Sequence, residues 1–178
     1  MREKDKLDRE QLIDGCLRAF VEAGTLDLSL DQLAKAVGIS KRMLVHYFGG
    51  RENIEERATT RLEERLRAQF STDSFPPGTS AKKVVKALWA RTSAPESRGV
   101  LLLVMDVSKR AWRGSARAKA FYEEQQRLWV ELLLKYMPGE RTVEEFLRLF
   151  QGAVLAYLIT GDADAGKRAL LRFVSRMK

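Results

Sequence analysis

Cationic side chains cluster in the stretch between Asp31 and Glu52. This stretch contains no acidic residue and four cationic ones: Lys35, Lys41, Arg42 and Arg51. Clustered lysine and arginine neutralise phosphates, and the same side chains can hydrogen-bond to guanine in the major groove of DNA. The stretch therefore favours contact with a polyanion. A solvated basic face on an ordinary helical hairpin is the alternative, because short hairpins are common.

The residues that follow Ser40 fit a short helix with two distinct faces. At about 100° per residue, one arc of this helix holds Lys41, Arg42 and Val45. The opposite arc is apolar and aromatic, and it holds Leu44, Tyr47 and Phe48. The apolar arc can pack against other helices while the cationic arc faces a groove. His46 falls between the two arcs, so it could contact DNA or pack at the flank.

Capping signals place this helix directly after another one. Ser29 is a good N-cap, and Gln32 further along completes a capping box. Gly38 suits the left-handed residue that ends a helix, and Ser40 can cap the next helix. Two helices joined by a glycine-bearing turn form the helix-turn-helix plan, in which the second helix enters the major groove.

Sites for catalysis or for a metal ion are not predicted. The sequence offers no convincing pair of carboxylates, no nucleophile beside a base and no glycine-rich phosphate loop, so we expect no enzyme and no cofactor. His46 is the only histidine and Cys16 the only cysteine, which excludes an intrachain disulfide and a metal-ligand set. Cys16 belongs to the apolar stripe of the first helix, where we expect a small buried hydrophobe.

The net charge of +8 is unevenly distributed along the 178 residues. Residues 1–75 hold 13 Lys and Arg against 14 Asp and Glu, whereas residues 76–178 hold 19 against 10. The first part is therefore close to neutral, and the overall basicity adds little to the case for DNA binding. In the second part, a solvated basic surface or an anionic ligand would account for the excess.

Helical patterns extend over the rest of the chain, and no strand pattern persists. We expect helices over 7–23, 51–70, 81–92, 96–112, 115–136, 141–160 and 164–177. The stretch 71–81 is rich in Ser, Thr, Pro and Gly and separates two halves. This predicts an all-α protein with a head (1–50), a connecting helix and linker (51–75) and a second helical domain (76–178). The charged N-terminus and the short apolar run at 100–105 predict neither a secretory signal nor a membrane span.

The segments LIDGCLRAFVEAG and LSLDQLAKAVGISKRMLVHYFGGRENI resemble the TetR family of bacterial transcriptional regulators, over roughly residues 8–57. The resemblance implies an all-α, cytoplasmic bacterial homodimer in which a connecting helix joins a three-helix DNA-binding head to a ligand-binding body. Carried over by position, the residues that would face bases are Lys41, Arg42 and Val45. Those that would contact the DNA backbone are Ser29, Tyr47 and Arg51, with His46 beside them.

Two positions depart from the family's usual pattern. Val45 stands where tyrosine is common, so this contact becomes apolar, for example to a thymine methyl group. Asp31 stands where a basic or small polar residue is common. We exclude Asp31 from the predicted site because an acid cannot help phosphate binding.

The helices over 115–136 and 141–160 are candidates for a dimer interface. The second is apolar around much of its circumference and must be covered on most sides. The predicted interface residues are Leu128, Leu132, Phe150, Gly152, Ala153, Ala156 and Tyr157. Burial in a single intramolecular core is the alternative. The two-fold symmetry of most helix-turn-helix proteins favours the dimer.

Aromatic and apolar residues in the second half could line a cavity for a small molecule. The candidates are Trp89, Leu102, Met105, Trp112 and Phe121. Plain core packing is the alternative for each of them. Asp106 interrupts the apolar run and could meet a cationic ligand, or it could pair with Arg110 on the helix surface.

Pattern and resemblance together predict a ligand-responsive transcriptional repressor. It would bind a double-stranded DNA operator as a homodimer and be released by an unidentified small-molecule effector. A helical protein-interaction module with a vestigial DNA-binding head is the alternative function.

Overall fold

The computed structural model describes residues 3–68, 75–76 and 78–177. These residues form nine α-helices and one 3₁₀ turn, with no strand, which confirms the expected all-α class. The elements are α1 (Glu3–Ala23), α2 (Leu30–Val37), α3 (Lys41–Phe48), α4 (Arg51–Ala68), α5 (Ala81–Thr92), η1 (Pro95–Ser97), α6 (Arg98–Trp112), α7 (Ala116–Leu133), α8 (Glu140–Thr160) and α9 (Ala163–Val174).

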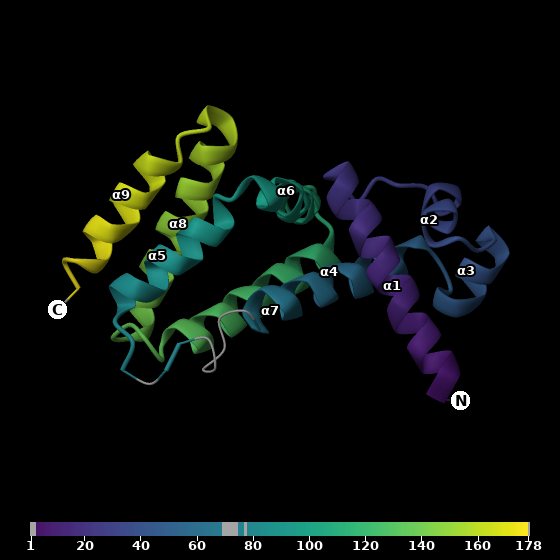
Figure 1. The fold of residues 1–178 in the computed structure, drawn as a ribbon, viewed down its shortest axis with the longest axis horizontal. Helices are drawn as coiled ribbons and strands as arrows, with labels where there is room; N and C mark the ends of the chain where they lie inside the picture. Colours follow the sequence, from purple (N-terminus) through teal and green to yellow (C-terminus); the bar gives the residue numbers. More distant parts are fainter. Residues whose placement is uncertain (1–2, 69–74, 77, 178) are drawn as a thin grey trace.

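Helices α1, α2 and α3 form a head at one end of the molecule (Figure 1). The apolar stripe expected on α1 turns inward, so Cys16, Leu17 and Phe20 are buried. Leu33 of α2 and Leu44 of α3 complete this core and have no exposed surface. Burial of each leucine side chain stabilises the head by about 1.5–3 kcal/mol.

Helices α5, α7, α8 and α9 share a second core, and α5, α8 and α9 lie at the opposite end from the head (Figure 1). Trp89 of α5 is buried there, and its ring meets the edge of the Phe150 ring at a centroid distance of 5.8 Å. Gly166 lets α9 approach this indole closely, because a Cβ atom on Gly166 would lie 2.3 Å from the Trp89 ring.

Helices α4 and α6 connect the two ends. Ile54 and Ala58 of α4 are buried in the same core as the head helices, and so is Leu103 of α6. Figure 1 shows α4 running beside α7, away from the head. The core of the head is therefore closed by residues from a helix of the second half, and a movement of α6 acts directly on it.

Four helix ends differ clearly from expectation. Helix α1 begins at Glu3 and not at residue 7, and α9 ends at Val174 and not at residue 177. The helix expected from residue 96 begins as a 3₁₀ turn at Pro95, and α6 starts at Arg98. Proline suits a first turn because its missing N–H would have no partner there. The helix expected to reach residue 136 ends at Leu133, and a turn leads on to Pro138. Most of the expected linker at 71–81 lies outside the described residues.

In the described ranges, every helix is too short or too polar to span a membrane.

Candidate nucleic-acid interface and cavity

Local hydrogen bonds hold the turn between α2 and α3. The Ser29 N–H donates to Gln32 Oε1 at 2.8 Å, and Ser29 Oγ accepts from the Gln32 N–H at 3.2 Å, which confirms the capping box. Gly38 ends α2 with a φ of 72°, which glycine adopts without steric penalty. Ser40 Oγ then accepts from the Met43 N–H at 3.2 Å and starts α3. The angle between the helices therefore depends on residues within the motif itself.

The exposed face of α3 carries the side chains predicted to read DNA. The exposed residues are Lys41, Arg42, Val45 and His46. Leu44 and Phe48 on the other side of the helix are buried, which fixes how α3 is rotated against the head. Met43 is also exposed, and the sequence analysis did not include it in the site. The free surface of α3 thus combines cations with a small apolar patch.

Asp31 pairs with a predicted base-reading residue. Its Oδ2 atom lies 2.9 Å from Lys41 Nζ, and both side chains are largely exposed. An exposed pair of this kind contributes less than about 1 kcal/mol to stability. If Lys41 contacts DNA as predicted, Asp31 would compete with phosphate for it.

Two predicted phosphate contacts also have partners within the head. Arg51 Nη1 donates to the Leu28 carbonyl at 3.4 Å, and its Nε lies 3.2 Å from Glu55 Oε1. The guanidinium of Arg9 lies over the ring of Tyr47, 5.7 Å from its centroid. Arg51 and Tyr47 therefore fix the position of α3 and α4 in addition to any role on DNA.

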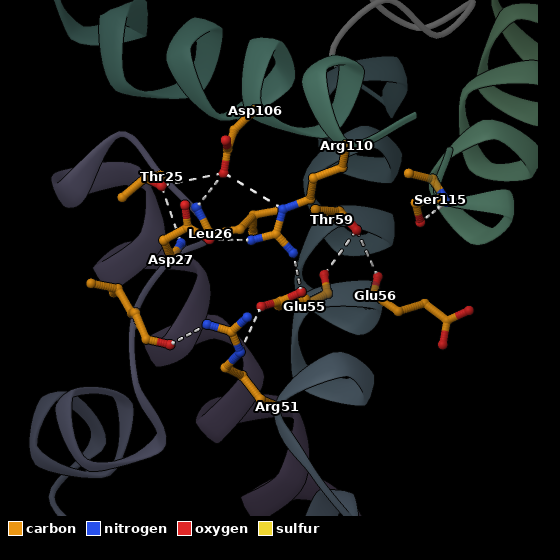
Figure 2. Close-up of polar contacts among 12 residues, drawn as sticks. Thr25, Leu26, Asp27, Arg51, Glu55, Glu56, Thr59, Asp106, Arg110 and Ser115 are labelled. Carbon is orange, nitrogen blue, oxygen red and sulfur yellow. Dashed lines mark hydrogen bonds and ion pairs between the residues drawn. The ribbon is translucent and has the colours of Figure 1, made fainter. Parts of the chain in front are cut away.

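Asp106 of α6 binds the loop that precedes α2 (Figure 2). Its Oδ2 atom accepts the Leu26 N–H at 3.0 Å and the Thr25 hydroxyl at 3.2 Å. Burial alone would raise the pKa of Asp106, but hydrogen bonds from Lys109 and Leu26 and the nearby cations hold it below its usual value. The expected ion pair with Arg110 is present, but Asp106 is buried against a loop 80 residues away and does not lie on the helix surface.

Arg110 joins three elements through three carboxylates (Figure 2). Nη1 donates to Glu55 Oε2 of α4 at 2.6 Å, and Nη2 donates to Asp27 Oδ1 at 2.8 Å. Nε lies 3.8 Å from Asp106 Oδ2. Burial raises the pKa of Glu55, and the charge of Arg110 opposes that rise. One guanidinium on α6 therefore ties the body to both the head loop and the connecting helix.

A cavity of about 600 Å³ is bounded by helices α4 to α8. The lining surface is mostly apolar, and its aromatic rings come from Phe121, Tyr122, Trp129 and Phe150. Tyr122 and Gln151 are hydrogen-bonded to each other at 3.1 Å on its wall. This volume and this mostly apolar surface are typical of small-molecule sites.

Two of the five predicted ligand contacts, Met105 and Phe121, line this cavity. The other three do not border it. Trp89 belongs to the adjacent core, where its Nε1–H donates to the Ala163 carbonyl at 2.8 Å. Leu102 packs beside Gly24 in the head, and Trp112 is 85% exposed. Composition could identify an apolar run on α6, but it could not identify which side of that helix the cavity occupies.

The cavity also contains a carboxylate that the sequence analysis missed. Glu63 of α4 lines it together with Thr59, Leu62 and Leu66. These four positions recur at helical spacing, so they share one side of α4. The sequence signal for this carboxylate was an acid on the same side of the helix as apolar residues.

The predicted dimer residues on α8 face two directions. Gly152 and Ala156 are exposed, and they continue into a ridge with Leu155 and the 75% exposed Ile159. Two small residues on an apolar ridge allow a second helix to approach closely.

Phe150 and Tyr157 turn toward the molecule's own core. Both rings meet the Trp89 ring, at centroid distances of 5.8 Å and 6.1 Å, and the Tyr157 hydroxyl donates to the Ser93 carbonyl at 2.8 Å. The remaining predicted residues, which are Leu128, Leu132 and Ala153, are half-buried. Helix α8 is apolar on most sides because it serves both the core and an open surface.

Known proteins resemble the head in sequence and the whole chain in fold. Residues 12–58 match the model of the family described as bacterial regulatory proteins, tetR family. Over 52 residues the chain is 36% identical to the HTH-type transcriptional regulator BetI of Brucella canis, a match that covers 29% of this chain and 26% of that protein. The chain therefore matches about a quarter of the length of this relative.

Two crystal structures share the fold over nearly the whole chain. A transcriptional regulator from Rhodococcus sp. Rha1 aligns with a TM-score of 0.76 and 15% identity, over 95% of each chain. A TetR-family transcriptional regulator from Streptomyces coelicolor aligns with a TM-score of 0.72 and 21% identity, over 94% of this chain and 79% of that one. The head therefore matches the tetR family in sequence over residues 12–58, and the chain as a whole shares the fold of these two regulators.

Proposed function

We propose that this protein is a transcriptional repressor that binds a DNA operator as a homodimer and releases it when a small molecule binds. Residues 1–50 bind DNA, residues 51–75 form the connection, and residues 76–178 hold the effector and the partner subunit. The observation that carries this proposal is the capped helix-turn-helix, whose second helix presents Lys41 and Arg42 to solvent.

Base contacts come from Lys41, Arg42 and Val45. Arginine can form two hydrogen bonds with guanine, and the valine methyl groups fit beside a thymine methyl. Arg42 forms no ion pair with any described residue, whereas Lys41 is held by Asp31. Arg42 therefore contributes more to base reading than Lys41 does. Backbone contacts come from Ser29, His46, Tyr47 and Arg51.

The exposed ridge of α8 supports the homodimer. Gly152, Leu155, Ala156 and Ile159 form an apolar surface that two copies can bury around a two-fold axis. The two α3 helices then enter successive major grooves, about 34–36 Å apart.

Helix α6 offers a route from the effector to the head. Val104 and Met105 line the cavity, while Asp106 and Arg110 bind the loop before α2 and the connecting helix. A ligand that displaces α6 therefore displaces the head. It weakens DNA binding only if it binds more tightly to the conformation that does not fit the operator.

Selection of bound fragments from a genomic library, followed by fluorescence polarisation, tests the DNA-binding part. Arg42→Ala should abolish sequence preference at one position and cost about 1–3 kcal/mol of binding free energy. Arg51→Ala should weaken binding to all sequences alike. Arg141→Ala is the matched control, because Arg141 lies on α8 and is highly exposed. Failure to select any fragment, together with capture of a protein partner, would favour the interaction-module alternative.

A further inference from the structure

Glu63 places a carboxylate in the wall of the apolar cavity. The residue lies on α4 and is only 8% exposed. A buried carboxylate loses the stabilisation that water supplies, and burial accordingly raises the pKa of Glu63. Such a group normally needs hydrogen-bond or ionic partners on both oxygens to be tolerated.

Among the described residues, partners reach only one of the two oxygens. The Trp129 Nε1–H donates to Glu63 Oε2 at 3.3 Å, and Arg67 Nη1 lies 3.8 Å from the same atom. Arg67 is also committed to Gln125, whose Oε1 accepts from the same nitrogen. Within the part of the chain that the structure describes, no donor reaches Oε1 of Glu63. Since a carboxylate can accept about four hydrogen bonds, this group retains capacity for another partner.

The other lining residues decide what kind of partner fits. Apart from Glu63, the only charged lining residue among those described is Arg91, which is exposed on α5. Arg67 is not part of the lining, so an anionic ligand would meet the Glu63 carboxylate and be repelled. A neutral apolar ligand would leave Oε1 without a partner. A cation can pair with the open Oε1 atom beside the more distant Arg67, and the aromatic rings that line the cavity favour a cation further.

We propose that the cavity binds an apolar cation, an amine or quaternary ammonium with a hydrophobic body, whose charged end lies at Oε1 of Glu63. The hydrophobic body occupies the aliphatic and aromatic remainder of the cavity. The inference rests on the proposed function in taking this cavity as the effector site. It does not depend on DNA binding, so the two can fail separately.

Calorimetric titration of the full chain, without DNA, tests this charge preference. The probes are decyltrimethylammonium, decanol and decanoate, which share a ten-carbon chain and differ in charge, each below its micellar concentration. We expect the ammonium to bind at least about tenfold more tightly than decanol, and decanoate to bind most weakly. Equal affinities, tighter binding of decanoate or no binding of the ammonium would overturn the proposal.

Substitutions on α4 assign the preference to one carboxylate. Glu63→Gln should lower the affinity for the ammonium at least about tenfold and change that for decanol less than about twofold. Glu63→Asp keeps the charge and should retain a preference for the ammonium even if packing is weakened. Glu64→Gln is the matched control, because Glu64 is the adjacent residue and faces away from this cavity. An ammonium affinity that Glu63→Gln leaves unchanged would refute the role of Glu63.

Discussion

Replacing Arg110 by methionine removes the guanidinium that joins α6 to α4 and to the head loop, while keeping much of the side chain's bulk. The main loss is the ion pair with Glu55, whose two side chains are 24% and 9% exposed. Removing one partner of a well-buried pair costs about 3–5 kcal/mol. Partial exposure of Arg110 and the remaining neighbour Arg51, 3.2 Å from Glu55, both reduce this cost.

We therefore expect Arg110→Met to lower the free energy of unfolding by about 2–3 kcal/mol. The second bond, to Asp27, adds less than about 1 kcal/mol of this because Asp27 is 63% exposed. Urea denaturation followed by circular dichroism measures the change. Arg117→Met is the matched control, since Arg117 pairs with Glu56 between α7 and α4 on the exposed surface. The control should lose less than about 1 kcal/mol.

A second substitution separates the lost charge pair from lost packing. If the cost arises from a carboxylate left buried without its partner, Glu55→Gln introduced into the Arg110→Met protein should restore about 1 kcal/mol or more. If the two substitutions acted only through independent losses of packing, their destabilising effects would add. The reasoning is refuted if Arg110→Met costs no more than Arg117→Met, or if Glu55→Gln destabilises the Arg110→Met protein further.

Three further predictions follow from single contacts. Asp31→Asn releases Lys41, so DNA affinity at low salt should rise about three- to tenfold with little change in stability. Fluorescence polarisation over a salt series measures this affinity, and weaker binding by the variant would contradict the prediction. Gly166→Ala puts a Cβ atom 2.3 Å from the Trp89 ring and should lower stability by about 1–3 kcal/mol, so an unchanged melting midpoint would argue against this packing. Burial raises the pKa of Cys16 to about 11, which keeps the thiol protonated near pH 8. Ellman's reagent should therefore react only after unfolding, and rapid reaction of the folded protein would show the thiol to be accessible.

The head could be predicted because its signals are local. Ser29, Gly38 and Ser40 mark helix ends through bonds to residues a few positions away. The apolar side of α3 followed from helical periodicity, and Leu44 and Phe48 are buried as that periodicity requires. None of these inferences needed information about the rest of the chain.

Contacts between distant segments could not be predicted in this way. Asp106 and Arg110 are spaced for a surface pair on one helix, and that spacing suggested the wrong setting. Their additional partners lie far earlier in the chain, Leu26 80 residues before Asp106 and Glu55 55 residues before Arg110, and nothing in the spacing indicates them. The pair of Asp31 with Lys41 was not predicted either, because the turn that brings them together was identified from its helix-capping residues alone.

The cavity shows the limit of composition. Leu102 and Met105 belong to the same apolar run, yet only Met105 lines the cavity while Leu102 packs against the head. Glu63 stands next to the charged Glu64 and Arg65 in the sequence, although helical spacing places it on the same side of α4 as Leu62 and Leu66. To decide which of two neighbouring apolar or charged residues on a helix faces the cavity, the positions of the surrounding helices must be known.

Hydroxyl-radical footprinting of a selected operator fragment can show whether two copies of α3 bind DNA together. If two copies of α3 read DNA as a homodimer, the protein should protect two patches whose centres are about 34–36 Å apart on one face of the duplex. Arg42→Ala should remove both patches at protein concentrations at which Arg141→Ala leaves them intact. A single patch, uniform protection along the fragment, or the same footprint with Arg42→Ala would contradict the account.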